Sequence, residues 1–167
     1  MKSLVFFGSL RSEKLLKVVL KKNDLEYLKI YNGKIFNSKL YKVKNENFPY
    51  LVKTNLTKDV TNCIYIENLT STDFKKILFY ESIEYRISKI TIKINKKNIF
   101  SNYFELIKKH KTSIEWSYEK WQPQFENYSC NAAKEWMFLF KKYKNNPKEA
   151  ENYWKKILID SKKNINF

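Results

Sequence analysis

The first candidates for binding or catalysis lie in a short loop near the N-terminus, because glycine is so scarce in this chain. Glycine occurs twice in 167 residues, at Gly8 and Gly33. Gly8 follows a short apolar run at 3–7 and precedes a helical pattern that Ser12 can cap. We therefore expect a tight strand–loop–helix connection, with Gly8 in a turn that other residues resist. Unpaired main-chain N–H groups in such a loop can hold a carboxylate or a developing oxyanion, although a plain structural turn explains the same pattern.

Metal and nucleotide chemistry find little support elsewhere in the chain. Cys63 and Cys130 lie far apart and belong to no Cys-x-x-Cys pair, and His110 is the only histidine. A zinc site needs more soft ligands than these, so we interpret both cysteines as buried thiols. A phosphate-binding loop would need more glycine and a Lys-Ser/Thr pair beside Gly8. We expect neither a metal nor a cofactor.

Strand patterns dominate the first 100 residues around this loop. The segment 25–44 is typical of paired strands, and Asn32-Gly33 is a strong signal for the hairpin turn between them. Further strands are predicted at 3–7, 48–52, 60–66 and 85–95, the last of these ending in a turn at 96–98.

Helical patterns occupy the middle and the end of the chain. Thr70 or Ser71 can cap a helix that runs to Glu81. Composition shifts after about residue 100, and three helices are predicted at 113–122, at 131–143 and from Asn146 onward. Their aromatic stripes are typical of faces that pack on a core.

Two motifs resemble the γ-glutamylcyclotransferase-like family, including its AIG2-like branch from plants. The loop Phe6-Phe7-Gly8-Ser9-Leu10 resembles the family's Tyr-Gly-Ser-Leu or Tyr-Gly-Ser-Asn loop. The stretch at 77–86, with sequence ILFYESIEYR, resembles a helix that ends in Leu-Asp-x-Tyr-Glu-Gly and is followed by Tyr and Arg. Phe48-Pro49 stands where the family often has Tyr-Pro, and the order agrees over about residues 3–95. Three motif positions differ, since Phe7, Leu78 and Ser82 replace Tyr, Asp and Gly.

The resemblance implies a fold and a domain organisation. The fold is of the α+β class, a small mixed β-barrel with flanking helices. The barrel domain would span residues 1–100, and residues 101–167 would form a helical C-terminal extension packed on it.

The resemblance also implies an enzyme, a transferase or lyase that acts on γ-glutamyl amide bonds. The α-amine of the γ-glutamyl group attacks its own γ-carbonyl, so that 5-oxoproline forms and an amine or a peptide leaves. Glu81 would be the catalytic acid/base that takes the proton from the ammonium and gives one to the leaving nitrogen. Since apolar residues flank Glu81, we expect burial to raise its pKa. The substrate-binding residues would be Phe7, Gly8, Ser9, Leu10 and Tyr85.

A non-catalytic binding module on the same fold is a second hypothesis. The replacements at Phe7, Leu78 and Ser82 favour it, as do four tryptophans that would cover the pocket or form a homodimer face: Trp116, Trp121, Trp136 and Trp154.

The positive charge raises a third hypothesis, a polyanion-binding protein. The net charge is +16, yet Arg11 and Arg86 are the only arginines, and lysine suits loose phosphate attraction more than base readout. The abundance of Lys, Asn, Ile, Tyr and Phe is the profile of an AT-rich coding sequence, which explains many lysines without any partner. We therefore expect a small γ-glutamyl substrate as the partner and no nucleic acid. A lysine stripe on one side of the molecule would favour the polyanion hypothesis.

The hydrophobic pattern bears on the location of the protein. No window approaches 18 apolar residues, so we expect no transmembrane helix and no membrane partner. The apolar run at 3–7 is too short for the core of a signal peptide. We interpret the chain as cytoplasmic.

Overall fold

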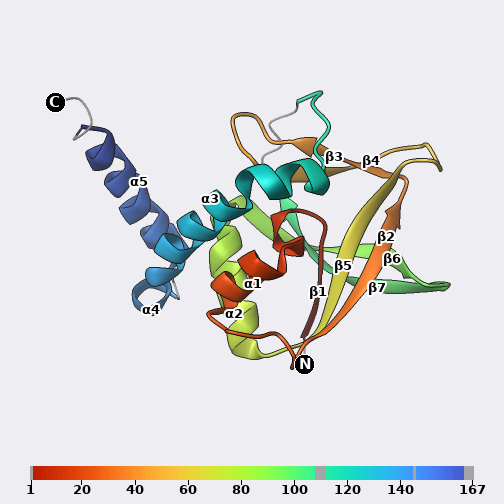
Figure 1. The fold of residues 1–167 in the computed structure, drawn as a ribbon, viewed down its shortest axis with the longest axis horizontal. Coiled ribbons are helices and arrows are strands. Elements are labelled where there is room, and N and C mark those ends of the chain that lie inside the picture. The colour runs from red at the N-terminus through yellow and green to blue at the C-terminus, as the bar shows by residue number, and fades with distance from the viewer. Residues whose placement is uncertain (1, 108–111, 145, 164–167) are drawn as a thin grey trace.

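Five strands of the chain close into a barrel (Figure 1). The computed structural model describes residues 2–107, 112–144 and 146–163. The barrel order is β1-β5-β2-β6-β7, and β1 meets β7 in the one parallel pairing that closes it. The barrel strands are β1 (Lys2–Phe6), β2 (Lys29–Phe36), β5 (Val60–Leu69), β6 (Tyr85–Ile94) and β7 (Lys97–Leu106).

Among the described residues, a two-stranded sheet and five α-helices flank the barrel. The small sheet pairs β3 (Ser38–Lys42) with β4 (Pro49–Lys53). Figure 1 shows the helices gathered on one side of the barrel, with α5 extending away from it. The helices are α1 (Glu13–Leu20), α2 (Ser71–Glu81), α3 (Tyr118–Phe138), α4 (Phe140–Tyr143) and α5 (Pro147–Lys163). This architecture confirms the predicted α+β class, a small mixed barrel with flanking helices and a C-terminal helical part.

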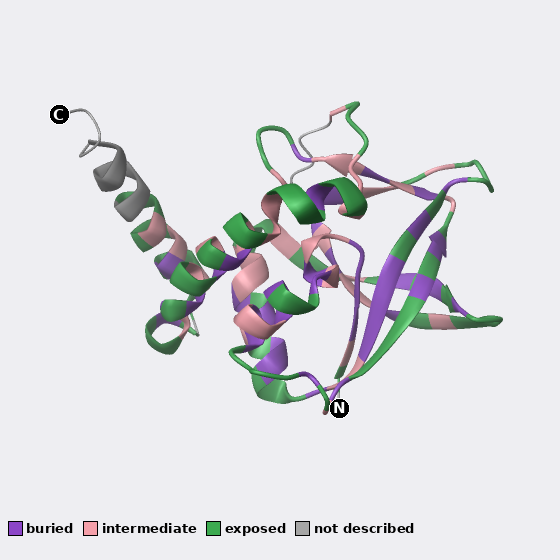
Figure 2. Ribbon diagram, viewed as in Figure 1, coloured by how far each residue is buried: buried purple, intermediate pink, exposed green. Residues whose placement is uncertain are grey.

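The alternation of side chains along β1 divides the core into two parts. Leu4 and Phe6 belong to the cluster between the barrel and the helices, whereas Val5 and Phe7 belong to the cluster inside the barrel. Successive residues of a strand point to opposite faces, so β1 serves both clusters at once. Buried and exposed positions also alternate in the second half of β2 and of β6, and Figure 2 shows such alternation on the barrel strands.

The residues predicted from the sequence to cap helices do so in the structure. The Ser12 hydroxyl accepts the N–H of Leu15 at 3.0 Å and begins α1. Thr70 and Asp73 form a reciprocal capping box at the start of α2. The Asn146 side chain accepts the N–H of Glu149 at 3.2 Å at the start of α5.

The predicted hairpin at Asn32-Gly33 is wrong. Both residues lie within β2, which pairs with β5 in continuous register from Lys29 to Phe36. Gly33 has no positive φ and lies where a Cβ atom would meet the Cys63 Sγ at 3.2 Å and the Ile94 side chain at 3.3 Å. Glycine is therefore needed at position 33 because neighbouring strands approach closely there, and not because of a turn.

Two further boundaries differ from the prediction. Residues 113–117 precede α3, which begins at Tyr118 and continues through Pro123 to Phe138, so the helices predicted at 113–122 and 131–143 are largely one element. Proline in an early turn removes one hydrogen bond without ending the helix, because buried Trp121 and other residues hold it on the core. The β6–β7 turn lies at Asn95-Lys96, one residue earlier than predicted. The barrel continues past residue 100, since β7 pairs with β6 along its whole length.

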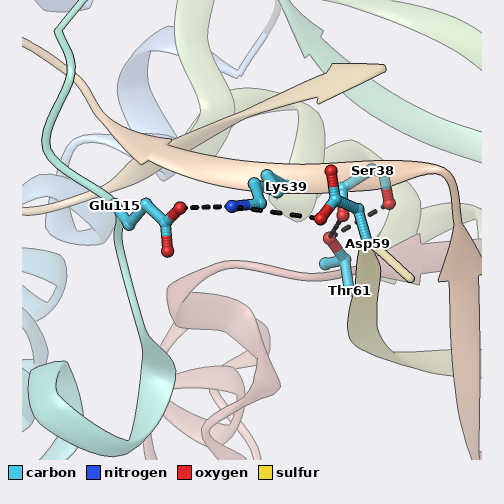
Figure 3. Close-up of polar contacts among 5 residues, drawn as sticks. All are labelled: Ser38, Lys39, Asp59, Thr61 and Glu115. Atoms are coloured by element: carbon cyan, nitrogen blue, oxygen red, sulfur yellow. Dashed lines mark hydrogen bonds and ion pairs between the residues drawn. The ribbon is translucent and has the colours of Figure 1, made fainter. Parts of the chain in front are cut away.

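A polar cluster joins the small sheet to the barrel and to the segment before α3 (Figure 3). The Ser38 hydroxyl donates to the Thr61 hydroxyl at 3.0 Å, and Thr61 donates in turn to the Ser38 carbonyl at 3.0 Å. Beside this buried pair, Lys39 bridges Glu115 at 2.5 Å and the buried Asp59 at 3.9 Å. The cluster fixes β3 and β4 over the open end of the barrel, next to the Gly8 loop.

The described residues offer neither a membrane-spanning helix nor a metal-binding cluster. None of their helices combines the length and the apolar character that crossing a lipid bilayer demands. Nor do these residues bring three or more His, Cys, Asp or Glu side chains together in a way that could hold a metal ion.

Candidate active site at the Gly8 loop

The structure brings all six residues predicted for the site to one small cavity of about 50 Å³. It lies where β1 ends, where α2 ends and where β6 begins. The six are Phe7, Gly8, Ser9, Leu10, Glu81 and Tyr85. Sequence reasoning assigned no role to the other lining residues, Val5, Phe6, Phe48, Pro49 and Phe104, although the Phe48-Pro49 pair was noted for its resemblance to Tyr-Pro.

Gly8 is special for its surroundings and not for its backbone angles. Its φ is −98°, outside the left-handed region, which corrects the expectation of a turn that only glycine tolerates. A Cβ atom on Gly8 would meet the Pro49 ring at 3.2 and 3.3 Å. Glycine therefore lets the loop and β4 approach each other closely at the cavity wall.

The loop after Gly8 is a single tight helical turn, Ser9–Arg11. Its first bond runs from the Arg11 N–H to the Gly8 carbonyl at 3.1 Å, and the Ser12 N–H then donates to the Ser9 carbonyl at 3.0 Å. The N–H groups of Ser9 and Leu10 precede this first bond, so they have no partner within the turn. They are the main-chain donors that a substrate carboxylate or oxyanion could use at this cavity.

Glu81 is the last residue of α2, and aromatic packing holds that helix end in place. Phe79 stacks on Trp136 with ring centroids 5.1 Å apart, and it contacts Phe140 edge-on at 5.4 Å. The Trp136 indole N–H also donates to the Phe79 carbonyl at 3.1 Å. Helix α3 thus fixes the position from which the Glu81 carboxyl reaches the cavity.

The surroundings of Glu81 change its acidity. Glu81 is half-buried, and burial raises the pKa of its carboxyl from 4.5 to about 8. The direction agrees with the shift expected from its apolar neighbours. A carboxyl with this pKa can hold or release a proton near neutral pH, as a general acid/base must.

Two tyrosines lie near Glu81. Burial, followed by the Glu81 charge, raises the pKa of Tyr85 well above its usual value. The same two causes raise the pKa of Tyr80, and a hydrogen bond from Ser9 opposes that shift. Both phenols therefore stay neutral, and Tyr85, which lines the small cavity, can donate a hydrogen bond there.

Ser82, directly after Glu81, has an unusual backbone. Its φ is 60° and its ψ is −162°, a conformation that glycine adopts readily and other residues rarely. The Ser82 hydroxyl donates to Glu151 of α5 at 3.3 Å. The chain is therefore strained at the residue that sets the direction of the helix end carrying Glu81.

A second cavity of about 510 Å³ adjoins the first one and shares Ser9, Phe48, Glu81 and Tyr85 with it. Its walls come largely from the C-terminal helices, and three of the four tryptophans line it: Trp121, Trp136 and Trp154. Trp116 instead packs beside it and donates its indole N–H to the Asn47 carbonyl at 3.1 Å. In the sequence, the aromatic stripes of the C-terminal helices are the feature from which this wall could have been predicted.

Carboxylates gather on the walls of the second cavity. In addition to Glu81 they are Glu46, Glu84 and Glu151. Burial and then the charge of Glu84 raise the pKa of Glu46. Glu84 is exposed to solvent, and its position also borders the cavity.

Comparisons with known proteins support the fold. No protein-family profile matches the chain, and no curated protein matches its sequence. Two solution structures of proteins from Arabidopsis thaliana are similar, one with TM-score 0.56 and 16% identity over 84% of this chain and 92% of that one. The other has TM-score 0.57 and 15% identity over 89% and 86%. A crystal structure of an uncharacterized protein from Pyrococcus horikoshii has TM-score 0.50 and 18% identity over 77% and 96%. Such low identities establish the barrel fold alone.

Proposed function

We propose that this chain is a γ-glutamylcyclotransferase-like enzyme of the AIG2-like type. It would release 5-oxoproline from a γ-glutamyl amine or peptide by intramolecular aminolysis. The observation that carries the proposal is the cavity in which the Gly8 loop meets Glu81, whose pKa is raised to about 8.

The acidity of Glu81 suits the first proton transfer. An α-amino group has a pKa near 8, so a carboxyl with a pKa of about 8 can take its proton with little free-energy cost. The freed amine then attacks the γ-carbonyl of the same molecule, and the protonated Glu81 returns the proton to the leaving nitrogen. Because the reaction is intramolecular, a cavity that holds the folded conformer supplies much of the barrier reduction.

The other site residues have matching roles in this scheme. The N–H groups of Ser9 and Leu10, which have no partner within the turn, would bind the carboxylate or the developing oxyanion of the substrate. Tyr85 would donate a hydrogen bond beside Glu81. The larger cavity would receive the leaving group, since it opens from the same four shared residues.

Ser82 gives independent support for the resemblance. The family motif has glycine after its glutamate, and the backbone at this position has a positive φ of 60° in this chain. A conformation suited to glycine thus occurs at the position where the family places glycine.

The direct test compares Glu81→Gln with its matched control Glu84→Gln. A panel of γ-glutamyl amines and peptides is incubated with each protein, and 5-oxoproline is quantified. We expect Glu81→Gln to abolish 5-oxoproline release and keep the native circular dichroism spectrum, whereas Glu84→Gln retains activity. Full activity of Glu81→Gln, or no 5-oxoproline from any substrate with the wild type, would refute the proposal; the latter result would favour a non-catalytic binding module.

A further inference from the structure

The outer surface of the barrel away from the helices carries an ordered set of exposed side chains. On β2, β6 and β7 these include Lys34, Phe36, Lys89, Lys93 and Phe100, which we call the lysine–phenylalanine face. The phenylalanine rings are strongly exposed, 43% for Phe36 and 69% for Phe100. Figures 1 and 2 show these strands on the side of the barrel opposite the helices. Large exposed aromatic side chains with a common orientation indicate an interaction surface.

Strand pairing arranges the face in two neighbouring rows. The first row crosses four strands and contains the paired residues Asn62, Lys34, Lys93 and Asn98, all of them exposed. The second row lies two residues further along each strand and contains Val60, Phe36, Thr91 and Phe100. Residues two apart on a strand point to the same side, so a polar, cationic row runs beside an apolar, aromatic one.

Lysines lie beside both rings; Lys93 belongs to the cationic row, and Lys89 lies two residues beyond Thr91 on β6. The Lys93 Nζ lies 5.6 Å from the centroid of the Phe36 ring, and the Lys89 Nζ lies 5.6 Å from the centroid of the Phe100 ring. Each exposed ring therefore has a lysine ammonium at its side. Neighbouring strands are about 4.8 Å apart, so two rings separated by β6 lie roughly 10 Å from each other.

Two of the three strands that carry this face contain no carboxylate, and Glu105 on the third, β7, pairs with Arg86. The sequences of β2 and β6 contain no Asp or Glu. Among the described residues no carboxylate forms an ion pair with Lys34, Lys89 or Lys93. Lys34 and Lys93 nevertheless face each other directly across β2 and β6. Like charges in such a pair destabilise a sheet, and an anion bound between them would remove that cost.

We propose that the lysine–phenylalanine face binds single-stranded nucleic acid. The cationic row neutralises phosphates, and unpaired bases stack on Phe36 and Phe100, which is how exposed aromatic residues on a sheet bind single strands. The amides of Asn62 and Asn98 at the ends of the cationic row add hydrogen-bond donors and acceptors for base edges. This function is separate from the proposed catalysis at Glu81.

The chemistry of the face favours this partner over two others. A duplex hides its bases, so the exposed rings would contribute little to binding it. An anionic lipid surface would use the lysines and the rings but not the flanking amides. Coding bias explains the number of lysines, but it does not explain why Lys34 and Lys93 lie opposite each other on two strands that contain no Asp or Glu.

The test uses fluorescence anisotropy with a labelled 15-nucleotide oligo(dT) and a duplex of the same length as probes. For the wild type we expect a dissociation constant on the order of 1 to 100 μM for oligo(dT), weakening as salt is added. The triple variant Lys34→Ala/Lys89→Ala/Lys93→Ala should lose about tenfold or more in affinity, because three phosphate contacts are removed. The matched control Lys120→Ala/Lys134→Ala/Lys148→Ala removes the same charge from exposed helix positions and should change affinity less than about threefold.

The double variant Phe36→Ala/Phe100→Ala separates stacking from simple charge attraction. We expect it to lose roughly 10- to 100-fold in oligo(dT) affinity, with unchanged thermal unfolding because both rings are exposed. 5-Oxoproline release should be the same in all face variants. The proposal is overturned by any of four results: no oligo(dT) binding by the wild type, equal losses in the two lysine variants, no effect of the phenylalanine variant, or binding only to the duplex or to phosphatidylserine vesicles.

Discussion

The Glu81 cavities and the lysine–phenylalanine face have opposite chemistry, although they belong to one barrel. Of the described residues that line the two cavities, none is lysine or arginine, and four are glutamates. The face has lysines and no carboxylate on its central strands. A net charge of +16 is therefore an average over regions of different sign, and composition alone cannot locate a site.

The two regions also use their charges differently. Burial changes the acidity of Glu81, so one group is tuned for proton transfer. The lysines of the face are exposed, and their effect depends on number and position. Salt screens exposed charges much more than buried ones. Four pairs of variants test these regions, in order of decreasing effect on stability.

The largest difference in stability is expected between alanine variants of two phenylalanines, one behind the cavity and one on the lysine–phenylalanine face. Phe79 is 2% exposed and stacks on Trp136, so Phe79→Ala should lower the free energy of unfolding by about 3–5 kcal/mol. Phe100 is 69% exposed, so Phe100→Ala should change it by less than about 0.5 kcal/mol. Urea unfolding of both variants measures this, and similar losses would contradict the contrast.

Glu81→Gln should change how stability depends on pH. The unfolded carboxyl releases its proton near pH 4.5, while the folded one keeps it until about pH 8. The stability that the bound proton provides is complete below pH 4.5 and is lost as the pH rises through 8. Relative to the wild type, Glu81→Gln should gain on the order of 4 kcal/mol between pH 4 and pH 9, because the pKa rises from 4.5 to about 8 and each unit corresponds to about 1.4 kcal/mol.

Urea unfolding at the two pH values measures this gain. The exposed control Glu84→Gln should differ little from the wild type at either pH. If Glu81→Gln follows the wild type at both pH values, Glu81 is not desolvated as described. The same acidity predicts that kcat/KM for 5-oxoproline release rises with pH up to about 8, since the base must be deprotonated.

Ser82→Gly should stabilise the protein. Glycine removes the backbone strain at φ 60°, which costs about 1–3 kcal/mol, but it also loses the hydrogen bond to Glu151. We expect a net gain of about 1 kcal/mol in thermal or urea unfolding, once the greater freedom of the unfolded chain is included. Ser71→Gly, in the regular first turn of α2, is the control and should destabilise. If Ser82→Gly loses as much stability as Ser71→Gly, the backbone at Ser82 is not strained.

The smallest effect on stability is expected from changing the cross-strand pair Lys34 and Lys93. Lys93→Glu places a carboxylate opposite Lys34 and should stabilise the sheet by about 0.2–1 kcal/mol. The same change should weaken oligo(dT) binding, because it puts a negative charge in the cationic row. Lys134→Glu on α3 provides the matched control for the change in net charge. Destabilisation by Lys93→Glu would show that the pair is not repulsive.

The parts of the fold that sequence predicted well depend on local signals. The strand, loop and helix around Gly8 follow from an apolar run, a glycine and the Ser12 cap, and the start of α2 follows from Thr70. The Asn32-Gly33 hairpin failed because long-range pairing with β5 outweighed a strong turn signal. The φ of Gly8 was not foreseeable either, since its need for glycine comes from Pro49, which is distant in sequence.

The candidate site was likewise predicted from the sequence only in part. Its six residues were found through two motifs whose spacing resembles a known family, and the structure places them on one cavity. One wall of the larger cavity comes from residues 121–154, whose aromatic stripes indicated packing but not what they pack against. The two rows of the face need the register of four strands, which no single strand pattern contains.

The parallel pairing of β1 with β7 has a consequence for biosynthesis. Val5 is placed opposite Tyr103, and β1 also pairs with β5. The N-terminal strand leaves the ribosome first but cannot take its final position until residues 60–106 have followed. Since non-local pairing slows folding, the Gly8 loop would stay open during synthesis, and any catalytic activity would begin only after the last barrel strand has been made.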